Sequence, residues 1–441
     1  MERLTRVSLS LLAVAAVAAT PARALADVPQ LRSSVYDDVA TLTASTLAAV
    51  DPAQAPPARR APAADDPYAP LGISAGGFTL FPSITLGTGA STNASNSAGG
   101  TPDGFWSVAP ELDIRSNWDT NSANLVLRGA YEDFFDGAAF PQPTASADGR
   151  FHFDFADQWG LDLGAGATYA EQSLSDPNYP AGADKPPGVV GLTTSAALNG
   201  AFGRLKLTLA GGAERTIYED ATSGITIIDQ SDRINTLYSG RLRLGYEIGP
   251  TLTPFVETEI GRRVYDQAVD QNNIARDGTS YAIRAGVEVN RDPLLKGELA
   301  VGFVRETFAD AALADLQGLS LEGSLVWSPR RLVTVTLAGN TQLSPTTDPA
   351  SSGSVLYSGS LDVAYAWRGN VTLDWISSVT SQRYQGTDEI DTTYDTGVSA
   401  TWKLNRELQL VASYSHQWLL STDPALPYQA DTVLAELKLL R

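Results

Sequence analysis

The chain is poor in the residues on which much protein chemistry depends. It has no cysteine, two histidines and one methionine among 441 residues. Without cysteine, disulfide frameworks and cysteine-ligated metal sites are excluded. Neither His152 nor His416 lies beside a nucleophile motif, so histidine-based catalysis has little support. We predict no enzymatic activity, no catalytic residue, no metal site and no cofactor.

Basic residues and long apolar runs are also scarce. There are 31 Lys and Arg against 50 Asp and Glu, a net charge of −19. A nucleic-acid partner requires a basic surface, so we expect none. No run approaches the ~18 consecutive apolar residues of a transmembrane helix. Glycine (38), tyrosine (16) and tryptophan (8) are plentiful. This composition is typical of a β-protein of the bacterial envelope.

Residues 1–26 predict a secretory signal peptide. Arg3 and Arg6 precede an apolar stretch over residues 7–19, and Ala24-Leu25-Ala26 fits the small-x-small cleavage pattern. The apolar stretch is too short to cross a membrane as a helix. We predict export and cleavage after Ala26, and an uncleaved N-terminal anchor is the alternative.

Residues 27–71 differ from the rest of the chain. Residues 31–50 could form a short amphipathic helix, and residues 51–70 are rich in proline and alanine, which is typical of an extended linker. One interpretation is a periplasmic spacer or docking segment. The other is a disordered tether, which the lack of a sustained hydrophobic pattern favours.

From Gly77 onward, apolar and polar residues alternate with period two. In the segment 281–290, Tyr281 and Ile283 alternate with Arg284 and Glu288. Such alternation predicts β-strands with one apolar and one polar face. We count about 18 segments and predict a transmembrane antiparallel up-and-down β-barrel over residues 72–441. The segments begin near Gly77, Ser107, Ala123, Gly149, Gly160, Val190, Arg204, Ile234, Leu252, Thr279, Leu295, Gln317, Arg331, Val355, Val371, Thr392, Glu407 and Ala430.

The connections between these segments alternate in length. Short turns such as Arg291-Pro293 and Arg368-Asn370 alternate with long polar loops such as Ser173–Gly188 and Asp266–Gly278. Short periplasmic turns and long extracellular loops are typical of outer-membrane barrels. A soluble sandwich or propeller has no reason to sort its connections in this way.

Tryptophans gather at the ends of strands near the short turns. Six of the eight fall there, and an indole favours the boundary between membrane and water. We therefore predict a periplasmic aromatic girdle, and aromatic packing in a soluble core is the alternative. The girdle residues are Trp118, Trp159, Trp327, Trp367, Trp375 and Trp402.

The polar faces of the strands carry many charges. A charge at the membrane midplane costs a few kcal/mol, so the polar faces should line the lumen, which in an 18-stranded barrel is wide enough for water. The charges either form a constriction that selects solutes or brace the wall as cross-strand pairs. Their mixed signs argue against strong ion selectivity. The pore-lining candidates are Glu111, Arg115, Arg128, Arg150, Arg241, Arg243, Glu257, Glu259, Arg263, Arg284 and Glu288.

Two further expectations concern neighbours in the lumen. Arg241 and Arg243 should lie beside Glu257 and Glu259 of the next strand. His152 has the polar register of its strand, so we expect it to form hydrogen bonds in the lumen rather than to act as a general base.

The start of the predicted barrel carries a family resemblance. Residues 70–83 contain Pro70-Leu71-Gly72, Gly76, Phe78 and Pro82-Ser83. This opening resembles the first strand of the putative β-barrel porin type 2 family, and the Leu-Lys-Leu-Leu-Arg ending is similar as well. The resemblance implies an outer-membrane channel. Some similar barrels accompany exopolysaccharide secretion, where the barrel would conduct polysaccharide from periplasmic export proteins.

These observations predict a porin-like channel for solutes in the outer membrane of a Gram-negative bacterium. The alternatives are a conduit for exopolysaccharide export and a structural barrel plugged by its loops. The expected partners are outer-membrane lipid, lipopolysaccharide and the barrel assembly machinery, with periplasmic polysaccharide-export proteins in the export alternative.

Overall fold

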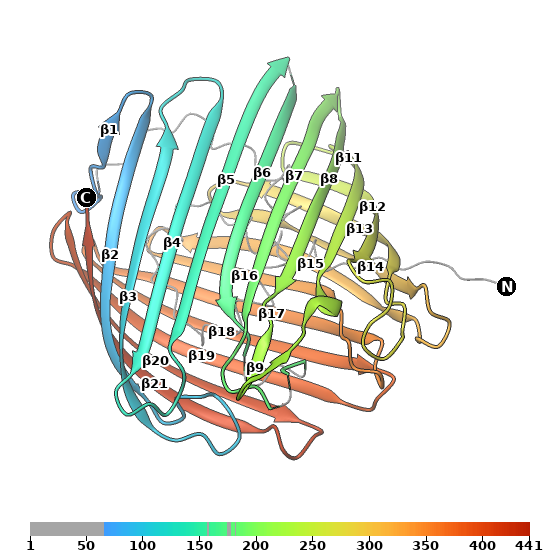
Figure 1. Ribbon diagram of the computed structural model, residues 1–441. Helices are drawn as coiled ribbons and strands as arrows, with labels where there is room; N and C mark the ends of the chain where they lie inside the picture. The colour runs from blue at the N-terminus through green and yellow to red at the C-terminus, as the bar shows by residue number, and fades with distance from the viewer. Residues whose placement is uncertain (1–65, 157, 174–177, 181) are drawn as a thin grey trace.

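The chain folds into one closed antiparallel β-barrel of 18 strands (Figure 1). The computed structural model describes residues 66–156, 158–173, 178–180 and 182–441; the predicted signal peptide and residues 27–65 lie outside this range. Each barrel strand pairs with the next along the chain, and β21 pairs with β2 to close the wall. The prediction of an up-and-down barrel is confirmed.

The barrel strands are β2 (Phe78–Ser91), β3 (Asp103–Ser116), β4 (Ser122–Phe134), β5 (Gln142–Ala156), β6 (Trp159–Glu171), β7 (Gly188–Phe202), β8 (Leu205–Tyr218), β11 (Asn235–Tyr246), β12 (Leu252–Tyr265), β13 (Gly278–Arg291), β14 (Leu295–Phe308), β15 (Leu316–Arg330), β16 (Val333–Ser344), β17 (Gly353–Arg368), β18 (Val371–Gln385), β19 (Ile390–Lys403), β20 (Leu408–Ser421) and β21 (Tyr428–Leu440). The smaller elements are β1 (Ile73–Ala75), the hairpin β9 (Ala221–Ser223) and β10 (Thr226–Ile228), and the short 3₁₀-helix η3 (Ser231–Arg233).

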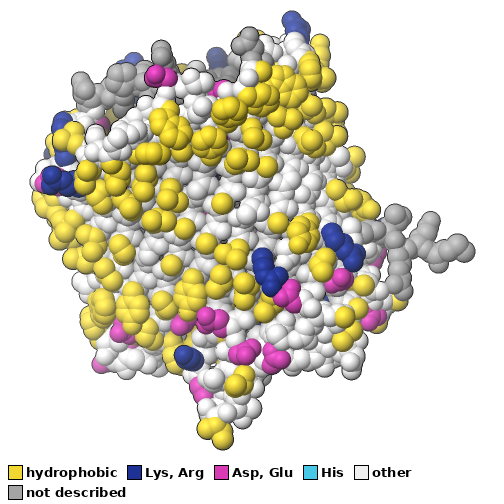
Figure 2. Space-filling view, turned by 45° about the horizontal axis from the view of Figure 1, so that its top comes forward, with side chains coloured by type: hydrophobic (Ala, Val, Ile, Leu, Met, Phe, Trp, Pro, Cys, Tyr) yellow, Lys and Arg dark blue, Asp and Glu magenta, His cyan; other side chains and the backbone are white. Residues whose placement is uncertain are grey.

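The two faces of the wall differ because successive side chains of a strand point to opposite sides. In β12, Val256 and Ile260 are exposed on the outside, whereas Glu257 and Glu259 between them are buried. Figure 2 shows hydrophobic side chains over much of the outer wall. The apolar register therefore faces outward, and the charged register faces the lumen.

The connections are sorted by length between the two rims. The turns β7–β8 and β17–β18 contain residues 203–204 and 369–370, whereas the loops β6–β7 and β8–β11 contain residues 172–187 and 219–234. By the rule for outer-membrane barrels, the rim with short turns is periplasmic and the other is extracellular.

The barrel closes where the first and last strands meet. The β2–β21 ladder runs from Ser91↔Thr432 to Ser83↔Leu440. Beyond it, β1 turns back at Gly76, whose φ of +61° suits glycine, and pairs with the remaining end of β2. The short strand β1 thus continues the row of hydrogen bonds that the C-terminal strand leaves incomplete.

The residues before β1 run along the periplasmic rim toward β19. The Asp66 carboxylate lies 3.2 Å from Lys403 Nζ, at the end of β19. Arg406, in the next turn, donates a hydrogen bond of 2.8 Å to the carbonyl of Pro67. The described chain therefore begins at the periplasmic end of the lumen.

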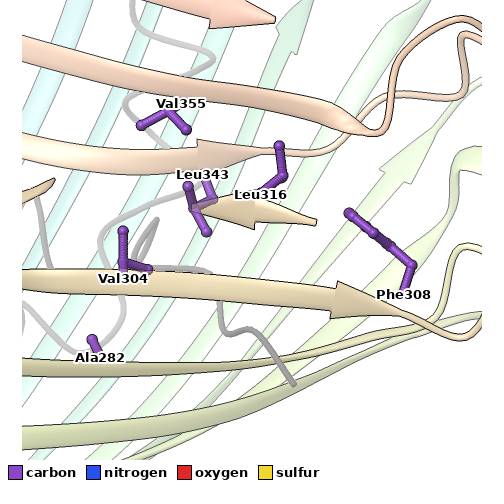
Figure 3. Packing of buried hydrophobic residues seen from close by; sticks show 6 residues of the cluster. All are labelled: Ala282, Val304, Phe308, Leu316, Leu343 and Val355. Atoms are coloured by element: carbon purple, nitrogen blue, oxygen red, sulfur yellow. The ribbon is translucent and has the colours of Figure 1, made fainter. Parts of the chain in front are cut away.

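One part of the wall is packed with apolar side chains at its extracellular end. The ladder between β15 and β16 ends at Glu322↔Asn340. Beyond this point an apolar cluster joins neighbouring strands (Figure 3). A Cβ added to Gly318 of β15 would lie 2.8 Å from Tyr357 Oη of β17, so the two strands pass close together. The cluster consists of Ala282, Val304, Phe308, Leu316, Leu343 and Val355.

We expect a charged side chain in the outward register to destabilise the barrel where it faces the middle of the membrane. Ile283→Arg on β13 should lower the free energy of unfolding by about 2–4 kcal/mol, because arginine would face lipid. Unfolding by denaturant in lipid vesicles measures this. The matched control is Ile225→Arg, since Ile225 is fully exposed in the β9–β10 turn. Equal stability of the two variants would contradict a lipid-facing register.

Candidate functional site: the lumen

The predicted pore-lining residues fall into two groups on different parts of the wall. Glu111, Arg115, Arg128 and Arg150 come from β3, β4 and β5, and the remaining seven come from β11, β12 and β13. All belong to the inward register. The two groups differ in the exposure of their side chains to water. Their possible roles therefore differ as well.

The group on β11 to β13 is a buried ionic network centred on Glu257. Arg241 lies opposite Glu259 in the ladder and Arg243 opposite Glu257, as expected from the sequence. Arg243 Nε donates to Glu257 at 2.7 Å, and Arg284 Nε donates to the other carboxylate oxygen at 2.9 Å. The side chain of Glu257 is 1% exposed. Desolvating these charges is costly, and several close opposite charges offset that cost.

The network extends to β14 and β15. Arg243 donates to both oxygens of Glu298, at 2.8 and 3.0 Å, and its guanidinium lies 4.2 Å from the Phe255 ring centre. Arg284 lies 3.0 Å from Glu259 and 3.3 Å from Glu322. Five strands are thus joined on their inner face. Glu298 and Glu322 join this cluster from strands beyond the immediate neighbours of β11, which the alternation pattern could not predict.

Two candidates lie at the edges of this network. Arg263 Nη1 donates to Asn235 Oδ1 at 2.7 Å, and its Nε lies 3.8 Å from Glu306. Glu288, nearer the periplasmic rim, lies 3.4 Å from Lys206 of β8. Every predicted residue on β11 to β13 therefore has an oppositely charged neighbour.

The group on β3 to β5 is open to water. Arg128 is 52% exposed and pairs with Glu111 at 3.1 Å and Asp148 at 3.8 Å. Arg115 pairs with Asp113 and lies over the Phe81 ring, 5.0 Å from its centre. Such exposed pairs contribute little to stability because water and salt screen them. These charges are accessible to a solute in the lumen.

Nearer the periplasmic rim, β5 carries two further polar positions. Arg150 lies opposite Asn124 in the same inward register. His152 lies between two carboxylates: Nδ1 is 2.6 Å from Asp162 and Nε2 is 3.0 Å from Asp154. Both ring nitrogens are engaged, as expected for a hydrogen-bonding residue, which leaves neither free to act as a general base.

A third region of the wall, on β17 to β19, carries three carboxylates in the inward register: Asp362, Asp374 and Asp395. Among the described residues, no ion pair reaches Asp362, Asp374 or Asp395. Asp374 is 3% exposed. It lies opposite Ser399 in the ladder, and the buried Ser399 hydroxyl interacts with its carboxylate. The lack of an ion pair distinguishes these carboxylates from the paired ones on β11 to β15.

The loops at the extracellular mouth are tied together by Arg276. Its guanidinium pairs with Asp270 at 2.6 Å and donates to the carbonyls of Thr346, Asp348 and Ser351 at 2.6, 2.8 and 3.1 Å. It thereby joins the β12–β13 loop to the β16–β17 loop. At the same rim, a hydrogen bond from Arg215 lowers the pKa of Asp266.

The described part of the chain contains no group of three or more His, Asp or Glu residues placed to hold a metal ion. No helix in it has the length and apolar character needed to cross a membrane.

The predicted girdle residues lie near the periplasmic rim. Trp118, Trp327, Trp367, Trp375 and Trp402 are exposed on the outer face. Trp159 packs against Phe202 with ring centres 5.2 Å apart. Contact with the membrane boundary remains a prediction.

Breaking the ionic network should destabilise the barrel. Glu257→Gln is expected to lower the free energy of unfolding by about 3–5 kcal/mol, because Arg243 and Arg284 would stay charged and buried without their central partner. Denaturant unfolding in vesicles measures the change. The control Glu111→Gln removes the exposed partner of Arg128 and should cost less than about 1 kcal/mol. Equal effects would contradict the distinction between buried and open charges.

Comparison with known proteins places the chain in a family. A family model described as putative beta-barrel porin 2 matches residues 66–441. No curated protein matches the chain.

Similar solved structures include Pseudomonas aeruginosa OpdO, with 12% identity over 82% of this chain and 97% of that chain and a TM-score of 0.39. The outer membrane protein opdK of the same organism has 10% identity over 82% of this chain and 99% of that chain and a TM-score of 0.40. The copper transporter OprC is another (10%, 84% and 84%, 0.45). A closed barrel with an apolar outer face and a charged lumen is a porin-like fold, which indicates the outer membrane. The family match covers most of the sequence, and the chain therefore belongs to the putative beta-barrel porin 2 family.

Proposed function

We propose that the barrel is a porin-like channel through which small hydrophilic solutes cross the outer membrane by diffusion. The observation that carries this proposal is the open charged wall of β3 to β5. Arg128, Glu111 and Asp148 face the lumen and remain accessible to water. A polar solute moving along this wall would exchange contacts with water for contacts with these groups. No catalytic group or cofactor is required.

The two interpretations of the lumenal charges apply to different parts of the wall. The network around Glu257 is buried, so we assign it to bracing the wall. The exposed charges on β3 to β5 are the ones that a solute meets. Because they include both signs, we expect weak ion selectivity. Transport of exopolysaccharide remains a prediction from the family resemblance alone.

Single-channel recording in a planar bilayer tests this function. The refolded mature protein and a form that begins at Asp66 are recorded in salt, and candidate oligosaccharides are then added. A stable open current from either form supports a channel, and blockade by a sugar identifies a solute class. Two silent forms, each shown to be a folded β-barrel by circular dichroism, would contradict the proposal.

A charge variant in the lumen tests whether the current follows the wall of β3 to β5. Arg128→Gln should shift the reversal potential in a salt gradient toward cation preference, because it removes an accessible positive charge. Arg215→Gln is the matched control: Arg215 has the outward register of β8 and pairs with a loop residue, Asp266. The same shift in both variants would argue against a path along β3 to β5.

A further inference from the structure

We propose that the extracellular end of the β16–β17 hairpin is a gate of the lumen. This hairpin end comprises residues 341–357, and in the structure it lies folded into the lumen. It swings outward to rejoin β15 in the wall, and this movement widens the lumen at its extracellular mouth. The effect on conductance rests on the proposed channel function, whereas the movement itself does not.

Side chains of the hairpin end that have the outward register are buried. Leu343 of β16 has the same register as Leu337, yet Leu343 is 0% exposed and Leu337 is 48% exposed. Val355 lies opposite Leu343 in the ladder and is 6% exposed. Both belong to an apolar cluster with Val304 and Leu316, which have the inward register of β14 and β15 (Figure 3). The outer face of the hairpin end therefore packs on the inner face of the neighbouring wall.

The inner face of β13 to β15 is apolar at the level where the hairpin end packs on it. The same register carries the charges of the ionic network farther along these strands. Apolar side chains that face water are unfavourable, and the hairpin end covers them. Gly318 leaves room for this packing, because an added Cβ would lie 2.8 Å from Tyr357 Oη. The folded-in hairpin end is therefore a stable resting state. The covered residues are Ala282, Val304, Phe308 and Leu316.

The folded-in state leaves one edge of β15 without a neighbouring strand. The ladder with β16 ends at Glu322↔Asn340, and no pair in the described part of the chain joins residues 316–321 to β16. At the point of separation, the backbone N–H of Leu321 donates to the Thr341 hydroxyl at 3.0 Å. A strand edge without a partner is costly within a membrane. An arrangement that pairs this edge is therefore favoured in that respect.

The hairpin end also suits a place in the wall. Continuing the β15–β16 register by four residues would place Gly318 opposite Ser344. Leu343 and Val355 would then face lipid, as apolar residues of the outward register do elsewhere on the wall. The same side chains thus suit two positions of the hairpin end, one packed on the inner wall and one paired with β15.

Two glycines lie at the level where the hairpin end leaves the wall. Gly339 of β16 and Gly359 of β17 are opposite each other in the ladder, one residue before Asn340. An added Cβ at either position would meet no atom closer than 3.5 Å, so close packing does not require glycine there. Glycine in a strand allows the backbone to bend. We assign these two residues to a hinge.

Arg276 holds the tip of the hairpin end in the folded-in position. Its guanidinium is anchored by Asp270 at 2.6 Å and donates to three carbonyl oxygens of the β16–β17 loop. Arg276 is 3% exposed, so water does not readily replace these hydrogen bonds. The bonds join the tip to the β12–β13 loop, and they must break before the hairpin end can move outward.

Disulfide trapping tests the two positions, because the native chain has no cysteine. Gly318→Cys is combined with Val355→Cys to trap the folded-in state, since an added Cβ at residue 318 lies 3.2 Å from Val355 Cγ1. Gly318→Cys with Ser344→Cys traps the outward state. In folded barrels in vesicles under oxidising conditions, we expect both disulfides by mass spectrometry. Gly318→Cys with Leu337→Cys is the control and should give none.

Each disulfide tests one part of the proposal. Absence of the 318–355 disulfide from folded protein would overturn the folded-in position. Absence of the 318–344 disulfide, while the 318–355 disulfide forms, would overturn the movement. Equal yields for the 318–344 pair and the 318–337 control would overturn it as well.

Conductance in a planar bilayer tests whether the movement is a gate. The oxidised 318–344 variant should conduct more than its reduced form, and the oxidised 318–355 variant should conduct less. A reductant should bring both variants to the same conductance. Equal conductance of the oxidised and reduced forms of both variants would overturn the gate.

A loop variant tests the role of Arg276. Added to the 318–344 pair, Arg276→Gln should raise the disulfide yield, because the charge-assisted hydrogen bonds to the hairpin tip are lost. The matched control is Arg262→Gln, which removes an exposed charge that pairs with Asp277 of the same loop. It should leave the yield unchanged. Equal yields for the two variants would overturn the role of Arg276.

The outcomes separate the gate from the channel function. If both disulfides form and every variant is silent in the bilayer, the channel function fails and the movement stands. If a stable current is recorded and only the 318–355 disulfide forms, the channel function stands and the gate is overturned.

Discussion

The structure depends on one constraint: within a membrane, every backbone N–H and C=O group must find a partner inside the protein. For strands this requires a closed wall, and closure here is the pairing of β2 with β21. The short strand β1 completes the last part of that seam. Once the wall is closed, the two-residue period of a strand divides the side chains between lipid and lumen. The apolar outer wall and the charged inner wall follow from this single requirement.

The inner wall is not uniform around the barrel. On β11 to β15, arginines and glutamates neutralise one another in a buried layer. On β3 to β5, similar charges stay open to water. On β17 to β19, the inward carboxylates of Asp374 and Asp395 are buried and form no ion pair among the described residues. The first part of the wall thus suits bracing, and the second suits contact with solutes. The charge and exposure of the lumenal side chains therefore differ around the circumference of the barrel.

The strands and faces could be predicted from the sequence because alternation is a local signal. All 18 predicted segments correspond to barrel strands, and Arg243 meets Glu257 because the two lie on neighbouring strands. The contact of Arg243 with Glu298 could not be predicted in this way, since it passes over β12 and β13. Nor could the contacts of Arg276, because loops have no periodicity.

The exposure of lumenal side chains to water also could not be predicted from the sequence. Arg128 and Arg243 have the same register, and their environments depend on side chains from distant strands. The resemblance in residues 70–83 pointed to the family that the comparison established. It did not indicate which part of the wall would be accessible.

The most direct test of a water-filled lumen is thiol modification in vesicles, which the absence of native cysteine makes clean. Arg128→Cys and Leu127→Cys are neighbours on β4 with opposite registers. A water-soluble, membrane-impermeant thiol reagent should modify Arg128→Cys rapidly when added on either side of the membrane, and Leu127→Cys much more slowly. The account would be contradicted if the reagent modified Arg128→Cys from neither side of the membrane, or if it modified the two cysteines at equal rates.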